Sequence, residues 1–81
     1  MKWQHTRRSE ADYRNAPLTV QRAFDKQVRL LTGNLLHPSL RSKKFDESQG
    51  IWQARVNQAW RFYFTIDADT YVIVRIVSHP K

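Results

Sequence analysis

The chain has 81 residues, of which fourteen are Lys or Arg and seven are Asp or Glu, so its formal net charge is +7. This length supports one domain and excludes a large enclosed cofactor cavity, because so short a chain buries only about 60% of the surface that its unfolded form exposes. The absence of cysteine excludes disulfide bridges and thiolate metal sites, while the excess positive charge favours a polyanionic partner, either a nucleic acid or an acidic protein.

The longest apolar runs span only a few residues, and the N-terminal stretch MKWQHTRRSEADY is charged throughout. We therefore expect neither a signal peptide nor a membrane span, and we expect a cytoplasmic protein. His5 and His37 have no partners at the spacing of metal ligands, so no metal and no other cofactor is predicted. A basic surface without any dedicated ligand is the alternative to a polyanion-binding one.

Helical periodicity dominates the first half of the chain. A short strand is expected over residues 2–6. Ser9, followed three residues later by Asp12, is then expected to cap a short helix that ends at about residue 15. Proline is tolerated in a first helical turn, so a second helix is predicted over residues 17–32, with Gly33 and Asn34 as its C-terminal cap. Its apolar residues recur at the spacing of a buried stripe: Val20, Phe24, Val28 and Leu31.

Strand-like alternation dominates the second half. Residues 35–50 contain Pro38, several serines and the Lys43-Lys44 pair, which predicts an irregular connection around the edge of a sheet. Residues 51–56, 60–66 and 71–77 are rich in aromatic and β-branched residues and predict three strands. The turns between them fall at residues 57–59 and 67–70. Together the two halves predict a single α+β domain over residues 1–81.

The register of the first hairpin follows from its side chains. A three-residue loop sets apolar residues opposite one another on one face: Val56 with Trp60, Ala54 with Phe62, and Trp52 with Phe64. The other face then pairs Arg55 with Arg61 and Gln53 with Tyr63. A two-residue loop would scatter the arginines across the apolar side, because a slip of one residue moves every side chain to the other face. We predict the first register, with the four large aromatic residues in the core.

The same test, applied to the second hairpin with a loop centred on residues 68–70, places Val72, Val74 and Ile76 on the core face. Arg75 then lies beside Tyr63, and Val77 beside Arg61. Continued in extended form, the chain carries His79 and Lys81 to the polar face. We expect a cationic surface there, formed by Arg55, Arg61, Arg75 and His79. Opposed arginines destabilise a sheet, and a bound phosphate would relieve their repulsion.

The stretches HPSLRSKK, GIWQARV, WRFYF and IVSHPK resemble the RelE/ParE superfamily of bacterial toxins, in its RelE-like branch. The most specific element is Arg55-Val56, a turn, and then Trp60-Arg61. The resemblance implies an N-terminal helical hairpin packed on a twisted antiparallel sheet. It also implies that the exposed face of the sheet holds mRNA, often in the ribosomal decoding site, where basic side chains promote attack of a 2′-hydroxyl on the adjacent phosphate.

The resemblance implies roles for individual residues. Arg61 matches the phosphate-stabilising arginine of the family, and Arg55 matches a basic position on the preceding strand. His79 lies where a proton donor or acceptor is needed, with Lys81 as a further catalytic candidate. The residues expected to bind RNA are Arg41, Lys43, Lys44, Gln53, Tyr63 and Arg75. Arg75 is equally consistent with a surface residue that pairs with an acid such as Asp67.

Two departures from the family pattern bear on activity. Gln53 stands where some members have a lysine, and the C-terminal tyrosine that several members use has no counterpart. Either His79 and Lys81 replace the missing groups, or the protein is a weak or inactive nuclease.

The leading hypothesis is the toxin of a type II toxin–antitoxin pair, a metal-independent endoribonuclease that cleaves mRNA on the ribosome. Its partner would be an acidic antitoxin that covers the basic face in a hetero-oligomer. One alternative is a ParE-like toxin that inhibits DNA gyrase without cleaving RNA. Another is a decayed member that only binds its antitoxin.

Overall fold

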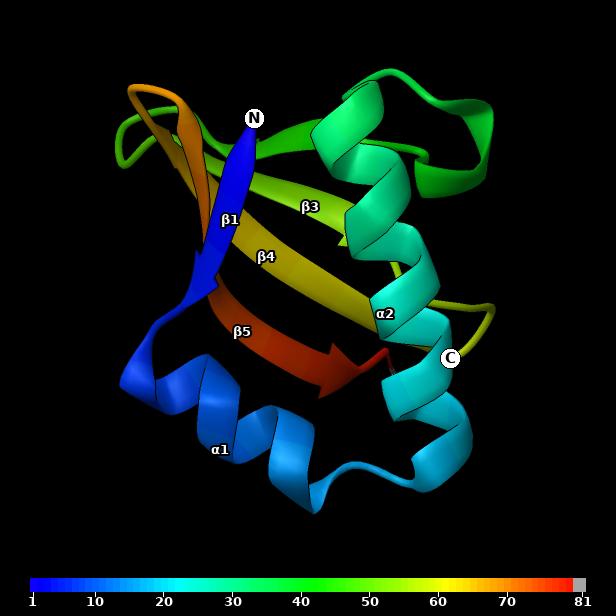
Figure 1. The fold of residues 1–81 in the computed structure, drawn as a ribbon. Helices are drawn as coiled ribbons and strands as arrows, with labels where there is room; N and C mark the ends of the chain where they lie inside the picture. The colour runs from blue at the N-terminus through cyan, green and yellow to red at the C-terminus, as the bar shows by residue number, and fades with distance from the viewer. Residues whose placement is uncertain (80–81) are drawn as a thin grey trace.

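The computed structural model describes residues 1–79, in which two helices pack on a five-stranded sheet (Figure 1). In chain order the elements are β1 (Lys2–His5), α1 (Arg7–Asn15), α2 (Leu18–Gly33), the 3-10 turn η1 (Pro38–Leu40), β2 (Lys43–Asp46), β3 (Ile51–Arg55), β4 (Trp60–Asp67) and β5 (Thr70–Ser78). The strand order is β1-β5-β4-β3-β2. The predicted α+β class, with its two N-terminal helices, is confirmed.

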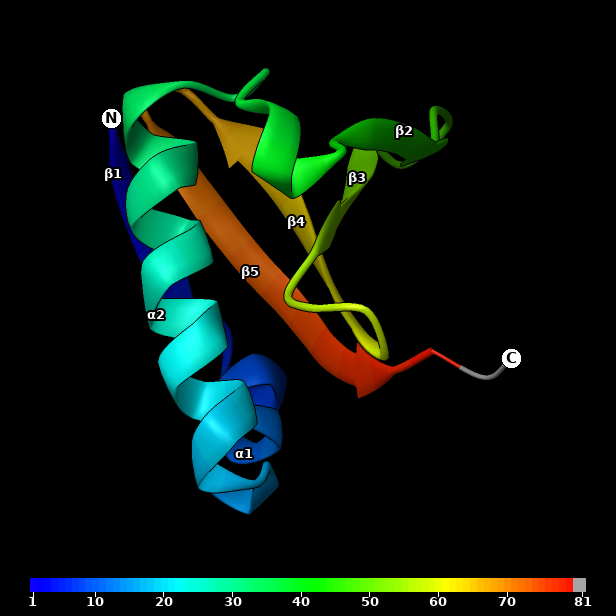
Figure 2. The ribbon, with the colours of Figure 1, turned by 90° about the vertical axis from the view of Figure 1, so that its right-hand side faces the viewer.

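The sheet is mostly antiparallel. The β2–β3, β3–β4 and β4–β5 pairs are antiparallel, whereas β1 runs parallel to β5. The predicted antiparallel sheet is therefore confirmed for β2 to β5, and β1 adds a parallel strand at its edge. A parallel neighbour requires a long crossover, and α1, α2 and the three strands that follow supply it. As Figures 1 and 2 show, α2 crosses one face of the sheet and α1 lies along β5.

The predicted apolar stripe of α2 forms the centre of the core. Its four members, Val20, Phe24, Val28 and Leu31, are buried. Phe24 contacts Phe62 of β4 edge-to-face, with 5.3 Å between ring centroids. Phe62 and Phe64 are fully buried, and Trp52 and Trp60 pack partly buried at the periphery of the core. The aromatic core assigned to the first hairpin is confirmed.

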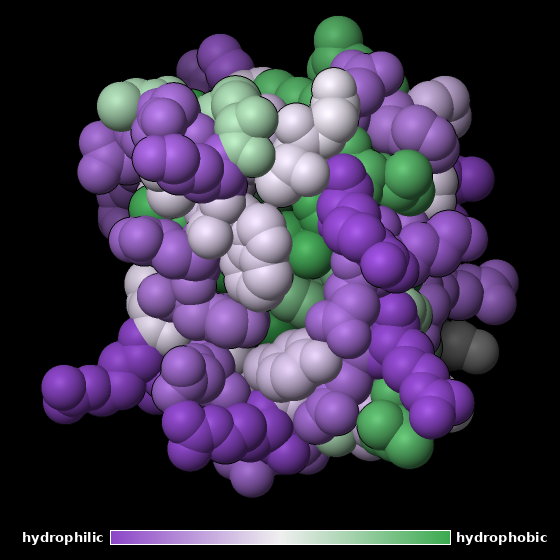
Figure 3. Space-filling model, in the orientation of Figure 1, coloured by the Kyte–Doolittle hydropathy of each residue, from purple (hydrophilic) through white to green (hydrophobic). Residues whose placement is uncertain are grey.

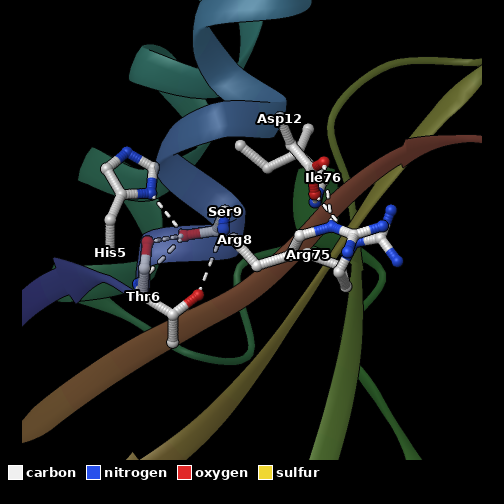
Figure 4. Close-up of polar contacts among 7 residues, drawn as sticks. All are labelled: His5, Thr6, Arg8, Ser9, Asp12, Arg75 and Ile76. Carbon is white, nitrogen blue, oxygen red and sulfur yellow. Dashed lines mark hydrogen bonds and ion pairs between the residues drawn. The ribbon is translucent and has the colours of Figure 1, made fainter.

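The first helix begins earlier than predicted. Thr6 is its N-cap, and the Thr6 hydroxyl accepts a hydrogen bond of 3.1 Å from the Ser9 N–H (Figure 4). The Ser9 hydroxyl in turn accepts one of 3.1 Å from the Thr6 N–H. The two residues form a reciprocal capping box, with serine in place of the usual Glu or Gln. Ser9 is thus inside the helix and fully buried, and its predicted role as the cap is wrong.

The second hairpin departs from the predicted register beyond Tyr63. Arg61 lies opposite Val77 and Tyr63 opposite Arg75, as predicted, but Phe64 lies opposite Ile73. One extra residue, Val74, therefore bulges from β5 and inverts the faces of the residues before it. The buried residues of this segment are Tyr71, Ile73 and Ile76. The assignment of Val72 and Val74 to the core is wrong, and the turn has two residues rather than three.

A further strand occupies the segment predicted as an irregular connection. Residues 43–46 form β2, the edge strand beside β3, with Lys43 opposite Gln53 and Lys44 opposite Trp52. Three of its four residues are exposed, and the strand lies at the edge of the sheet. It therefore lacks the alternation of apolar and polar residues that identifies a half-buried strand.

The outer edge of β5 is covered in two parts. β1 pairs with its first half, from Thr70 to Ile73. In the second half the carboxylate of Asp12, on α1, accepts hydrogen bonds from the Ile76 N–H at 3.0 Å and from Arg75 Nε at 2.8 Å (Figure 4). An open strand edge exposes unpaired N–H groups, and Asp12 satisfies one of them while anchoring α1.

The Asp12 carboxylate is 14% exposed, so we expect Asp12→Ala to lower the free energy of unfolding by about 1–3 kcal/mol, because it leaves the Ile76 N–H without its acceptor. Urea denaturation measures the change. Asp69→Ala is the control, because the Asp69–Lys2 pair is largely exposed and should contribute less than about 1 kcal/mol. Equal losses for the two variants would contradict the assigned role of Asp12.

His5 links β1 to α1 inside a cage of aromatic rings. Its Nδ1 lies 2.7 Å from the Ser9 hydroxyl, and its ring stacks on Phe24 with 5.7 Å between centroids. Burial lowers the pKa of His5, and the carboxylates of Glu10 and Asp25 partly offset that decrease. The folded protein thus favours the neutral imidazole.

This decrease in pKa predicts a pH dependence of stability. Below about pH 6.5 the unfolded chain binds the His5 proton more readily than the folded chain, so the free energy of unfolding should fall as the pH drops through that value. Urea denaturation between pH 7.5 and 5.5 measures the effect. His5→Gln should flatten the profile. An unaltered profile in His5→Gln would show that another group is responsible.

Candidate nucleic-acid interface

A cleft of about 310 Å³ lies on the face of the sheet that α2 does not cover. Its lining residues are Arg41, Lys43, Gln53, Arg55 and Arg61, which we call the cationic cleft. Among residues 1–79, its lining contains four cations and no acidic residue. Because side chains alternate along a strand, residues 53, 55 and 61 point away from the core that residues 54 and 62 enter.

Arg55 and Arg61 lie directly opposite each other on β3 and β4, as predicted, and both line the cleft. The Nε atom of Arg55 is buried and has no hydrogen-bond partner among residues 1–79. Burial lowers the pKa of Arg55, and the positive charges of Arg41 and Arg61 lower it further. A buried donor without a partner costs free energy, so this guanidinium is suited to an anionic ligand.

The guanidinium of Arg61 is fixed by the turn that precedes it. Its Nη1 donates to the carbonyl oxygens of Asn57 at 2.7 Å and Trp60 at 2.9 Å, with a longer bond of 3.3 Å to Gln58. The Asn57 side chain in turn accepts from the N–H groups of Ala59 and Trp60, both at 2.9 Å. Arg61 is therefore held in position by the protein before any ligand binds, which is the preorganisation that electrostatic catalysis requires.

Arg41 and Arg55 are positioned by one buried residue that the sequence analysis missed. Gln27 of α2 is 4% exposed, and its Nε2 donates to the Arg55 carbonyl at 2.8 Å and to the Ser39 carbonyl at 3.1 Å. Its Oε1 accepts from the Ser39 hydroxyl at 3.1 Å. Arg41 follows Ser39 by two residues, with a left-handed backbone at φ 47°. The sequence signal was present, because Gln27 is a polar residue on the apolar face of its helix.

An apolar hollow of about 250 Å³ adjoins the cationic cleft. It is lined by Phe45, Ile51, Tyr63, Val74, Arg75 and Val77, and we call it the aromatic recess. Phe45 is 59% exposed and contacts Tyr63 edge-on, with 4.9 Å between ring centroids. The Tyr63 hydroxyl donates to Gln53 at 3.2 Å, which joins the recess to the cleft. Phe45 was missed because its segment was predicted as an irregular connection.

The other predicted site residues lie outside the cleft. Lys44 is on the opposite face, with its ammonium 5.9 Å from the centroid of the Trp52 ring. Arg75 is at the edge of the recess and pairs with Asp12, not with Asp67. His79 is exposed, and its N–H donates to the Ala59 carbonyl at 2.6 Å, beside the turn that holds Arg61. Lys81 lies outside the described residues.

Residues 1–79 offer neither a metal site nor a membrane-spanning helix. In this part of the chain no group of three or more His, Asp and Glu side chains is arranged to hold a metal ion. Neither of its helices combines the length and the apolar character needed to cross a membrane.

Solved toxin structures share this fold. The YoeB/ParE toxin from Agrobacterium tumefaciens matches with a TM-score of 0.82 at 15% identity, over 99% of this chain and 100% of that chain. The YoeB dimer from Staphylococcus aureus matches with a TM-score of 0.81 at 15% identity, over 99% of this chain and 98% of that chain. The RelB–RelE antitoxin–toxin complex from Methanococcus jannaschii matches with a TM-score of 0.74 at 13% identity, over 91% of this chain and 87% of that chain. No protein-family model and no curated protein matches the sequence. The predicted resemblance to RelE/ParE-type toxins is confirmed at the level of the fold.

The contacts of Gln27 predict that Gln27→Leu lowers the free energy of unfolding by about 1–3 kcal/mol, because it leaves buried carbonyl groups without donors. Gln21→Leu is a matched control on the same helix. The Gln21 side chain donates to the Tyr13 carbonyl at 2.7 Å, but that carbonyl also accepts from the Ala16 N–H, so its loss should cost less. Urea denaturation compares the two, and a larger loss in Gln21→Leu would contradict the role given to Gln27.

Proposed function

We propose that the chain is the toxin of a type II toxin–antitoxin pair and that it acts as a metal-independent endoribonuclease on mRNA bound to the ribosome. The observation that supports this most directly is the pair of opposed arginines, Arg55 and Arg61, in a cleft whose lining has no carboxylate. A polyanion neutralises such a pair, and a phosphodiester does so with planar, multidentate hydrogen bonds. The shared fold of the solved toxins supports the same proposal.

The proposed reaction is attack of a ribose 2′-oxygen on the adjacent phosphorus. The new bond from the 2′-oxygen to phosphorus forms as the bond to the 5′-oxygen breaks, which leaves a cyclic phosphate and a free 5′-hydroxyl. Negative charge grows on the phosphoryl oxygens during this step, and fixed guanidinium groups stabilise it. Arg61, held by the carbonyl groups of its turn, and Arg55, with its unpartnered Nε, serve this role.

Proton transfer is assigned to the C-terminal segment. The 2′-hydroxyl must lose a proton and the leaving 5′-oxygen must gain one. His79 follows β5 beside the turn that holds Arg61, and imidazole exchanges protons near neutral pH. We assign this role to His79, with Lys81 as a further catalytic candidate.

The bases and flanking phosphates have separate places on the same face. Phe45 and Tyr63 offer exposed aromatic surface for a base, and such stacking contributes about 1–3 kcal/mol per base in other proteins. Arg41, Lys43 and Gln53 are the polar contacts closest to Arg55 in the cleft. Arg75 borders the recess and Lys44 lies on the other face, so we give these two a lesser part in RNA binding.

We infer an antitoxin partner in the same compartment as the mRNA, the cytoplasm. RelE from Methanococcus jannaschii is solved with RelB, and YoeB from Staphylococcus aureus with YefM, as toxin–antitoxin complexes. For this chain, an acidic segment that fills the cationic cleft would be attracted by the same charges as RNA and would exclude it.

One observation favours a second candidate function. The lining of the cationic cleft contains no His, Asp or Glu that could exchange a proton with the reacting groups. A non-nuclease toxin of the ParE kind, which inhibits DNA gyrase by binding, needs no such group. A decayed toxin that retains only its antitoxin affinity needs none either.

The ribonuclease proposal predicts that purified protein cuts mRNA on translating ribosomes, as measured by mapping of mRNA 5′ ends. Arg61→Ala should slow cleavage by about 10²- to 10³-fold, since it removes charge stabilisation at the phosphate. His79→Ala should slow it by at least about 10²-fold. Arg14→Gln is the control, because Arg14 is exposed on α1 and pairs with Glu10.

The three candidates give different outcomes in that assay combined with expression in cells. Growth arrest with intact mRNA would reject the nuclease and support gyrase inhibition. Neither arrest nor cleavage would support the decayed toxin.

A further inference from the structure

A third, larger hollow of about 560 Å³ lies next to the cationic cleft, between α2, η1 and the end of β3. It shares Arg41 and Arg55 with the cleft. Lys26 of α2 and Asn57, which follows β3, are among its other lining residues. We call this hollow the α2 groove. The two hollows form one continuous depression with Arg41 and Arg55 at their boundary.

The positive charge of the cleft continues through this groove. Lys26 belongs to an exposed basic stripe on α2, formed by Arg22, Lys26 and Arg29 at spacings of four and three residues. In Figure 3, strongly hydrophilic side chains gather over α2. Within residues 1–79 the ion pairs involve other cations, namely Lys2, Arg8, Arg14 and Arg75. The stripe is therefore not neutralised by the described part of the chain.

The nearest acid on α2 is engaged elsewhere. Asp25 accepts hydrogen bonds from the Tyr13 hydroxyl at 3.0 and 3.1 Å, which ties its carboxylate to α1. The α2 groove itself has no acidic lining residue. An anionic ligand in the groove would therefore have no carboxylate among its lining residues.

The three hollows follow the direction of β3. Ile51 lies in the aromatic recess, Gln53 and Arg55 in the cationic cleft, and Arg55 and Asn57 in the α2 groove. Alternate residues of a strand share a face, so Ile51, Gln53 and Arg55 lie along one face of β3, and Asn57 follows in the turn beyond its end. An extended ligand that runs along β3 would thus pass the three hollows in this order. The orphaned Nε of Arg55 lies on a residue shared by the cleft and the groove.

We propose that the α2 groove is a phosphate-binding extension of the RNA site and that single-stranded RNA continues into it from the cationic cleft, with Lys26 and Arg41 as its contacts. This inference rests on the proposed ribonuclease function. The lining favours RNA over a protein segment, because a docked helix or strand is anchored by large apolar side chains, and the groove offers only the small apolar surfaces of Ala23, Pro38 and Val56.

The proposal predicts a length-dependent effect of Lys26. Fluorescence anisotropy would measure binding of non-cleavable 2′-O-methyl RNA of three and of twelve nucleotides. Lys26→Gln should weaken binding of the long RNA by about fivefold and lower its salt slope by about 0.7, the value for one phosphate contact with a single strand. It should leave the short RNA, which fills only the cleft, unaffected.

Lys2→Gln is the matched control, because it removes the same charge from β1 at the opposite edge of the sheet. Circular dichroism would check that both variants fold. Equal affinity of Lys26→Gln and Lys2→Gln for the long RNA would overturn the proposal, and so would an equal loss for both RNA lengths. A loss of affinity for a poly-glutamate peptide without any RNA length dependence would overturn it in favour of an acidic protein partner.

The groove proposal and the nuclease proposal can fail independently of each other. The nuclease proposal fails if mRNA ends remain intact, whereas the groove proposal fails in a binding measurement that involves no cleavage. RNA binding with the expected length dependence but without cleavage would leave the groove in place and reject the catalytic assignment.

Discussion

The opposition of Arg55 and Arg61 is the feature on which the proposed site depends, and the core on the other side of the sheet enforces it. Their neighbours Ala54 and Phe62 are buried opposite each other. A slip of one residue would expose Phe62, whose burial contributes about 1.5–3 kcal/mol, and would turn the arginines into the core. Packing therefore decides the register, and the like charges are held together as its consequence.

The positive charge of the cleft also depends on where the acidic residues lie, because none of them lines it. Asp12 is bonded to the edge of β5, Asp25 to Tyr13, Glu10 to Arg14, and Asp46 to Ser48. Each carboxylate stabilises a helix, an edge or a turn. None of them lines the cleft or the α2 groove. Although the chain has seven acids, the lining of the cleft and of the groove thus contains cations and no carboxylate.

The sequence predicted the structure correctly where apolar and polar residues alternate clearly enough to distinguish the two faces of a strand. In the first hairpin only one register separates apolar from charged residues, so the pairing was predicted correctly. In β5 the residues from Tyr71 to Val74 are apolar on both faces, so alternation could not reveal the bulge at Val74. β2 is an exposed edge and has no apolar face to detect. Gln27 and Phe45 entered the candidate site only when the fold brought their elements beside β3.

The same separation of faces explains how the fold can recur at 15% identity. The core needs apolar side chains of suitable volume at alternating positions, and many sequences meet that requirement. The outer face needs particular chemical groups, and function resides there rather than in the fold. In this chain the outer face of β3 runs from an aromatic recess through opposed arginines to a lysine-lined groove. Any polyanion that occupies this face relieves the repulsion between Arg55 and Arg61. Two different polyanions that bind there would therefore compete for the same surface.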